Sequence, residues 1–491
     1  MWAGSRMDNS DAQFSGFRKN LPILFAVAPI HLLLSTIVRR LSPARWIHFS
    51  LAFSLIFLTV AHGFHLLKIL ALLVINFAIS KAAGGSKWNP LLTWTWNVGT
   101  LFLIEWTKGF KFLNPDPEAN VFGGIMRWDV TFNITVLRLI SFNLDSYWAH
   151  HDSGSRIIDS HKCSEPPSAT TALQAPYCCA KLRTQLPHPL PAYSLTTYLA
   201  YAMYIPLFFA GPILTFNSFL SQLPTSRPSP LPLRSNLLYT MRLLFALFLM
   251  DLFMHLFHIP ALTRAQAWTH LAPSSLAAIG FLNLKHIWLK LLIIWRFFRT
   301  WSLWDAIIPP ENMRRCVSNN YSTLAFWRDW HASFNLWNVR YLYVPLGGAR
   351  TRMWNTWVIF TFVAVWHDLK LKLFAWGWLI ALFMVPELVA KWATRAWWEA
   401  SGVGFVACMV ICLFASSQIM FEIRNEEERR RRKRWVEAGV GGADNGEDQE
   451  EKVPLVQVGV TAASGMGSGA GGDNGSVVRG RAAAVNGMDS F

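Results

Sequence analysis

Apolar runs long enough to cross a bilayer recur along most of the chain, and they limit its fold more than any other feature. A spanning helix needs about 20 mainly apolar residues. Of 491 residues, 53% are apolar and only 15% are charged, too few to cover several soluble domains. The pattern therefore predicts an all-α, polytopic transmembrane helical bundle. The runs are 21–38, 46–64, 66–79, 91–106, 195–216, 236–257, 284–298, 354–366, 371–389 and 403–420.

The distribution of these runs predicts three regions. Residues 1–20 form a polar N-terminal segment, and residues 21–421 form one multi-span domain. Several runs are short, so we expect about eight to eleven helices that cross or enter the membrane, some of them buried in protein. From about 149 to 191 the composition shifts to His, Ser, Pro and Lys, which predicts a polar loop. Lys285, Lys290, Arg296 and Arg299 favour an interfacial or cavity-lining helix over a lipid-facing one.

The last 70 residues have a different character. Three acidic residues at 426–428 precede six basic ones at 429–434, and Gly, Ala, Asp and Ser follow with few aromatics. This composition predicts a disordered tail over 422–491. A basic cluster directly after a span favours the cytosolic side of a membrane, so the tail is expected to be cytosolic.

Charge and cysteine usage exclude several classes of function. The net charge is +16, but the basic residues flank apolar runs, which predicts contacts with membrane lipids rather than with nucleic acid. The six cysteines show no paired spacing typical of zinc sites, and no metal site is predicted. Cys163 with either Cys178 or Cys179 remains a candidate for one loop-closing disulfide.

Residues 326–348, FWRDWHASFNLWNVRYLYVPLGG, combine aromatic and polar side chains at close spacing. On a helix, His331, Asn335 and Asn338 would share one face. Trp327, Trp330 and Trp337 would then supply rigid walls. Polar groups are costly inside a membrane, so this stripe predicts a functional cavity.

A second histidine, His367, closes the apolar run 354–366. Partial desolvation would favour its neutral form, and a neutral imidazole is able to accept a proton as a general base. Its position leaves two interpretations open. The residue is either a cap at the membrane interface or the base of a catalytic site.

At these two histidines the chain resembles the membrane-bound O-acyltransferase superfamily. The similarity lies in residues 326–331, residues 340–348 and a histidine in a hydrophobic helix 36 positions after His331. The resemblance implies helices around a tunnel, with His367 as the catalytic base and His331 assisting it. It also implies that Arg328, Asn335, Trp327 and Trp330 shape the substrate site.

Further stretches resemble one branch, the fungal glycerol-uptake-protein group related to hedgehog acyltransferase. These are residues 8–14, 137–145, 206–213 and 295–313. That branch implies a multi-pass protein of the endoplasmic reticulum membrane. It would transfer a long acyl chain from acyl-CoA to a free hydroxyl of a lyso-form glycosylphosphatidylinositol (GPI) anchor lipid. The resemblance implies acyl-CoA as a co-substrate, and it implies no cofactor or metal.

Two alternatives to this activity stay open. The acceptor could instead be a lysophospholipid, a sterol or a protein, because the histidine pair serves the same donor chemistry in each case. A glycerol transport protein or regulator is the other alternative, although transporters often contain internal repeats and none is visible in this sequence. In similar proteins the segment matching residues 8–13 follows an earlier span, so a first helix is expected to be missing here.

Overall fold

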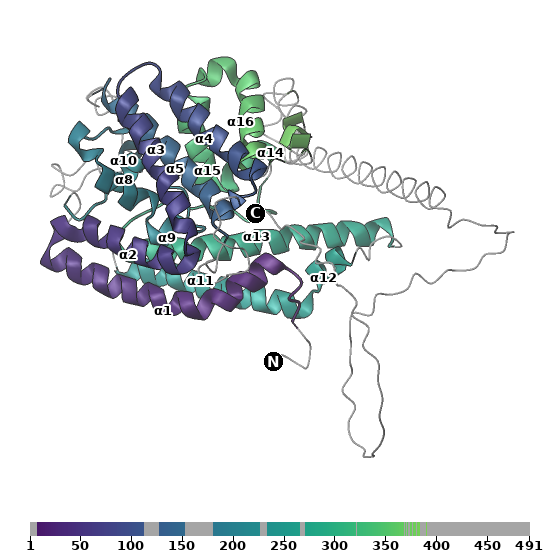
Figure 1. Ribbon diagram of the computed structural model, residues 1–491. Helices are drawn as coiled ribbons and strands as arrows, with labels where there is room; N and C mark the ends of the chain where they lie inside the picture. The colour runs from purple at the N-terminus through teal and green to yellow at the C-terminus, as the bar shows by residue number, and fades with distance from the viewer. Residues whose placement is uncertain are drawn as a thin grey trace, which may run out of the picture. The chain divides into compact units, whose positions relative to one another are not determined.

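The computed structural model describes residues 7–111, 127–152, 180–225, 233–265, 271–320, 322–367 and scattered positions from 369 to 389. Every regular element in these ranges is a helix (Figure 1). The longer ones are α1 (Ala12–Leu41), α2 (Trp46–His62), α3 (His65–Ala83), α4 (Asn89–Trp106), α5 (Trp128–Ala149), α11 (Leu233–Leu256), α13 (Pro273–Trp304) and α16 (Arg352–His367). The shorter ones are η1 (Pro43–Arg45), α7 (Ala180–Gln185), η6 (Leu190–Ala192), α8 (Leu195–Ala202), α9 (Ile205–Phe208), α10 (Phe216–Leu220), α12 (Ile259–Arg264), α14 (Thr323–Asp329), α15 (Ala332–Asn338), the π-helix η7 (Val339–Tyr343) and η8 (Gly348–Thr351).

Five helices in the described part are long and apolar enough to cross a membrane: α1, the continuous η1–α2 unit, α3, α11 and α13. They contain the predicted runs 21–38, 46–64, 66–79, 236–257 and 284–298 almost entirely. Large apolar side chains on these helices stay exposed, as Ile56 (69%) and Leu33 (63%) illustrate, which suits a surface that faces lipid. The prediction of an all-α polytopic membrane protein is confirmed.

Two further predicted runs are also helical, as α4 and α16. The runs 371–389 and 403–420 fall mostly or wholly outside the described residues, as do most of the polar loop at 149–191 and the whole tail. Cys163, Cys178 and Cys179 lie outside them as well, so the candidate disulfide stays a prediction.

The run 195–216 is not one spanning helix, and that prediction is wrong. The chain forms α8, then the four-residue α9, then an extended stretch that leads to α10. Pro206 and Pro212 lack the amide hydrogens that a continuous helix needs. Gly211 packs so closely on Leu207 that a Cβ would collide with it. The segment is apolar because protein surrounds it, not because it faces lipid.

Helix α5 was not among the predicted spans, although other helices surround it. It packs against α3, α4, α8 and α10, and 15 of its 22 residues are buried. The buried set includes Arg138, Asn143 and Asp145, which lower the hydropathy of the helix. Neighbouring helices satisfy these polar groups, so the helix does not need an apolar sequence.

A buried amide network joins α5 to α3, α4 and α8. Asn76 and Asn143 form a reciprocal pair, with Nδ2 to Oδ1 distances of 3.0 and 3.1 Å. Asn97 Nδ2 donates to Asn76 Oδ1 at 3.0 Å, and Asn76 Nδ2 donates to the Tyr198 hydroxyl at 3.1 Å. All four side chains are fully buried. Interhelical hydrogen bonds of this kind stabilise helix packing where the hydrophobic effect is weak.

Replacing Asn143 by leucine is expected to lower the free energy of unfolding by about 2–3 kcal/mol, because the partner amide is left buried and unpaired. Thermal unfolding of the detergent-solubilised protein would measure the change. Thr59→Val is the matched control, since it removes an exposed hydrogen bond from Thr59 to Leu55. Equal unfolding temperatures for wild type and Asn143→Leu would contradict a stabilising role for the network.

Basic residues of α13 form ion pairs with acidic residues elsewhere in the chain. Arg296 and Arg299 lie 3.9 and 3.3 Å from the Glu311 carboxylate. Lys290 Nζ lies 2.7 Å from Asp11, the residue that caps the start of α1. Protein-facing partners keep these charges away from lipid.

Asp11 joins α1 to α13. One carboxylate oxygen accepts from the Phe14 amide at 2.9 Å, and the other lies 2.9 Å from His286 Nε2 and 2.7 Å from Lys290 Nζ. Burial raises the pKa of this carboxyl, but the bonds from His286 and Lys290 outweigh burial and hold the pKa below its usual range. Asp11 is therefore ionised when α1 is docked.

Candidate active site

The segment that carries His331 is two short helices with a break between them. Helix α14 ends at Asp329, and α15 begins at Ala332. His331 itself has φ +48° and ψ +49°, the left-handed conformation, and precedes the first turn of α15. The prediction that His331, Asn335 and Asn338 share one face of a single helix is therefore wrong. Asn335 is nevertheless linked to His331 by a backbone hydrogen bond, because the Asn335 main-chain amide donates to the His331 carbonyl at 3.1 Å.

Asn312 fixes this break from the preceding loop. Its carbonyl accepts from the Ala332 amide at 2.9 Å, and its Oδ1 accepts from the Ser333 amide at 3.1 Å. Both are amides at a helix start, which have no partner within their own helix. Asn312 is fully buried. It therefore fixes the start of α15 and the backbone of His331 together.

Aromatic rings surround the His331 imidazole. Trp295 stacks on it with ring centroids 4.4 Å apart, and the rings of Phe334 and Trp366 lie at 5.3 and 6.0 Å. His331 lies between helices, outside the spanning segments. Burial, followed by the nearby His367 imidazole, lowers the pKa of His331 to about 3. The ring is consequently neutral at physiological pH and has one N–H donor and one acceptor.

His367 is the last residue of α16, and its ring lies edge-on to Trp366 at 4.7 Å. Trp366 is 5% exposed, and its ring lies beside both imidazoles, with centroids 6.0 Å from His331 and 4.7 Å from His367. Two hydrogen bonds hold it against α5: its Nε1 donates to the Asn133 carbonyl at 2.8 Å, and Asn133 Nδ2 donates to the Trp366 carbonyl at 3.1 Å. The structure thereby brings together the two histidines that the sequence singled out.

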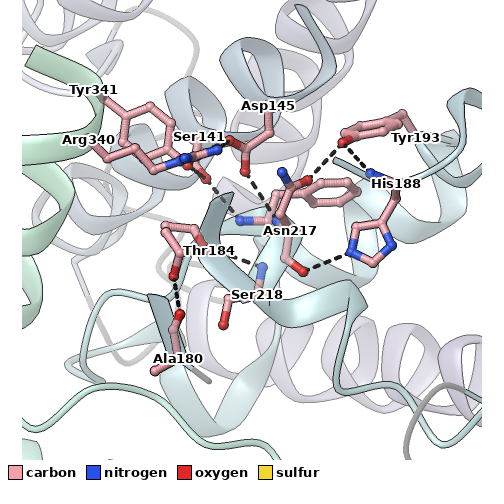
Figure 2. Close-up of polar contacts among 12 residues, drawn as sticks. Ser141, Asp145, Ala180, Thr184, His188, Tyr193, Asn217, Ser218, Arg340 and Tyr341 are labelled. Atoms are coloured by element: carbon pink, nitrogen blue, oxygen red, sulfur yellow. Dashed lines mark hydrogen bonds and ion pairs between the residues drawn. The ribbon is translucent and has the colours of Figure 1, made fainter. Parts of the chain in front are cut away.

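A buried charge cluster anchors the chain that follows His331 (Figure 2). Asp145 on α5 is fully buried, and its Oδ1 accepts from Arg340 at 2.7 Å and from the Tyr341 hydroxyl at 3.0 Å. The Tyr341 hydroxyl also lies 2.8 Å from Ser141 Oγ. Trp337 Nε1 donates to the Leu137 carbonyl at 3.0 Å. Helix α15 and the π-helix η7 are thus fixed along α5.

The cluster continues on the opposite side of Asp145 (Figure 2). The Asn217 amide donates to Asp145 Oδ2 at 3.2 Å, and the Tyr193 hydroxyl donates to Asn217 Oδ1 at 2.8 Å. His188 Nε2 lies 3.0 Å from the Asn217 carbonyl. Burial lowers the pKa of His188, which favours its neutral form. One carboxylate therefore connects η7, α5, α10 and the loop that contains His188.

The sequence of this helical region matches a known protein family. A family model described as MBOAT, membrane-bound O-acyltransferase family, matches residues 82–423. The match covers more than half of the chain and includes both histidines. The chain belongs to the membrane-bound O-acyltransferase family.

Comparison with individual proteins supports this assignment. The membrane-bound O-acyltransferase GUP1 of Saccharomyces cerevisiae is 37% identical over 476 residues, covering 87% of this chain and 84% of that protein. The gup1 protein of Schizosaccharomyces pombe is 40% identical over 405 residues, covering 80% and 68%. A more distant relative, the protein-cysteine N-palmitoyltransferase HHAT of Mus musculus, is 27% identical over 290 residues, covering 56% and 52%. The chain is therefore an acyltransferase.

The other predicted site residues of this membrane-bound O-acyltransferase differ in their packing and in their exposure to solvent. Trp327 lies edge-on to Phe326 and Phe360, with centroids 5.0 and 6.4 Å away. Trp330 stacks on Phe326 at 5.5 Å. Arg328 is exposed, and Asn335 is half-buried. Their roles in substrate binding stay predictions.

Sequence reasoning overlooked two residues that lie beside the histidines of the candidate site. Trp295 and Trp366 provide the closest rings to the histidines, yet neither was predicted as a site residue. Trp366 could have been suspected because it adjoins His367, whereas Trp295 lies on α13, far from both histidines in sequence. In the described part of the chain, no three His, Cys, Asp or Glu side chains gather as a metal-binding group. The two imidazoles can take part in proton transfer and hydrogen bonding.

Proposed function

We propose that this acyltransferase transfers a long acyl chain from acyl-CoA to a free hydroxyl of a lyso-form GPI anchor lipid in the endoplasmic reticulum membrane. The cytosolic placement of the tail belongs to the same proposal. The observation that carries it is the convergence of His331 and His367 on the ring of Trp366. Two imidazoles among aromatic rings suit proton transfer away from bulk water.

In the proposed reaction, His367 acts as the general base. Its neutral imidazole takes the proton of the acceptor hydroxyl as the oxygen attacks the thioester carbonyl, forming a C–O bond. The C–S bond then breaks, and the imidazolium returns the proton to the departing CoA thiolate. His331, neutral and stacked on Trp295, would donate one N–H to the acyl oxygen as negative charge develops there.

The choice of a hydroxyl acceptor rests on the relatives. Proteins named O-acyltransferases match at 37–40% identity across at least 80% of this chain. The relative named a cysteine N-palmitoyltransferase matches at 27% across 56%. The resemblance to the glycerol-uptake-protein branch supports an anchor-lipid acceptor over a lysophospholipid, a sterol or a protein.

Microsomes from cells that express the protein would test the acceptor. They would be given labelled long-chain acyl-CoA with lyso-form anchor lipid, and lysophosphatidylinositol as a competing acceptor. We expect label on the anchor lipid at least tenfold above that on the competitor, because a site built for one headgroup leaves polar groups unpaired with another. Microsomes with His367→Ala at equal protein level supply the background.

Preferential label on lysophosphatidylinositol would replace the anchor lipid as the acceptor while keeping the chemistry. Labelled glycerol uptake that proceeds equally in wild type and His367→Ala, without label on any lipid or protein, would instead favour the transport alternative.

A further inference from the structure

Helix α5 contacts both histidine-bearing segments. Near its start, Asn133 binds Trp366, the residue before His367. Near its end, Ser141 and Asp145 bind Tyr341 and Arg340, in the π-helix that continues from α15. Asn133 and Asp145 are twelve residues apart, which corresponds to roughly 18 Å along an α-helix. A single rigid element therefore holds both segments.

The contact at Asn133 is specific to this position. The pair is reciprocal, with the indole bonded to the Asn133 backbone and the Asn133 side chain bonded to the Trp366 backbone. The side-chain bond ends on the carbonyl of the residue directly before His367, in the last turn of α16. Carbonyls in a last turn have no amide partner within their own helix, so Asn133 supplies one from another helix. Loss of this bond would leave only the indole bond of Trp366 between Asn133 and the helix end that carries His367.

The contacts with α15 and η7 are more numerous. The Arg340–Asp145 ion pair, the Tyr341 hydroxyl and the Trp337 indole all bind α5. Loss of one of them would leave the others to hold the segment of His331. Among the described residues, the end of α16 has two hydrogen bonds to α5, both with Asn133, so we expect the position of His367 to be the more sensitive of the two.

We propose that Asn133 is a positioning residue of the acyltransferase, which sets where the His367 imidazole stands relative to His331. The proposal rests on the assignment of these two histidines to the reaction. In this role Asn133 acts through the backbone of Trp366, to which its side chain is bonded. Displacing a reacting group by about 1 Å costs roughly 100-fold in rate, so one hydrogen bond at this place has a large effect.

Cross-linking measures the geometry without any assay of activity. In a chain with His331→Cys and His367→Cys, and with the other cysteines replaced by serine, a short bis-maleimide should join the two positions. Adding Asn133→Leu should lower the cross-linking rate at least threefold. Asn236→Leu is the matched control, because it also removes an asparagine bond to a helix carbonyl, that of Leu303 at 3.4 Å. It should leave the cross-linking rate unchanged.

Kinetics in the otherwise native chain supply a second readout. Asn133→Leu should lower kcat 10- to 100-fold and leave KM for acyl-CoA within twofold, since the binding surface is kept. Asn236→Leu should keep kcat. A general loss of structure would instead lower the unfolding temperature and change KM together with kcat. If Asn133→Leu does not accumulate, Asn133→Ser serves in its place, since serine is too short to reach the Trp366 carbonyl.

The two arms separate the two proposals. Slower cross-linking with Asn133→Leu supports the positioning role, whether or not an acceptor is found. Unchanged cross-linking, or an unchanged kcat in an active enzyme, overturns it. Absence of transfer by the wild type to every acceptor contradicts the proposed function, while the cross-linking result still decides the role of Asn133.

Discussion

Replacing His367 by alanine is expected to lower the rate of acyl transfer about 10²- to 10⁴-fold, the contribution usual for a positioned general base. The physical reason is that alanine has no group to accept the proton of the acceptor hydroxyl. His331 stacks on Trp295 and has the separate proposed role of donating to the acyl oxygen, so we do not expect it to replace the base. Initial rates with labelled acyl-CoA in microsomes, at matched protein levels, would measure the loss.

Two control variants sharpen this test. His367→Gln fills a similar volume and keeps hydrogen-bonding capacity, but an amide does not accept a proton at neutral pH, so its loss of rate should equal that of His367→Ala. His151→Ala removes an exposed imidazole just after α5 and should keep the wild-type rate. A wild-type rate in His367→Gln would exclude proton transfer by this imidazole.

The second large effect is expected at the buried ion pair of Figure 2. Asp145→Ala removes the partner of Arg340, leaving a guanidinium with little exposure and no carboxylate. Breaking a buried pair from one side typically costs about 3–5 kcal/mol. Folded proteins are stable by only about 5–15 kcal/mol, so this variant should accumulate poorly. Thermal unfolding in detergent and resistance to proteolysis would report the loss.

Removing both charges should be milder than removing one. The double variant Asp145→Leu with Arg340→Met leaves no buried charge and should regain part of the lost stability. Asp129→Ala is the control on the same helix, because its partner Arg127 is mostly exposed and such pairs contribute about 0–1 kcal/mol. Equal unfolding temperatures for Asp145→Ala and Asp129→Ala would contradict a structural role for the buried pair.

The lipid-facing helices were predictable from the sequence because one local property decides them. The predicted run 46–64 corresponds to α2, and 236–257 corresponds to α11, each within three residues at either end. Their apolar side chains must face lipid whatever the rest of the chain does. Helix α5 follows another rule. Arg138 and Asp145 are tolerated because distant segments bond to them, and a window of local hydropathy does not contain those segments.

The residues of the candidate site also fall into two groups, those recognisable from local sequence and those that depend on distant contacts. His331 and His367 stood out because each is a polar group in unusually aromatic or apolar surroundings. Trp295 and Asn133 did not, because their importance comes from contacts with residues 36 and 233 positions away. The break at His331 was also missed. Its left-handed backbone is imposed by Asn312 rather than by a glycine in the local sequence.

That left-handed backbone limits which amino acids can occupy position 331, independently of any requirement for catalysis. Among non-glycine residues, Asn, Asp and His adopt positive φ most readily, whereas β-branched side chains rarely do. A saturation library at this position should therefore yield folded protein mainly with glycine and small polar residues, even if recovered by abundance alone. The backbone at position 331 therefore accepts few residue types, and most of these types have a side chain that forms hydrogen bonds.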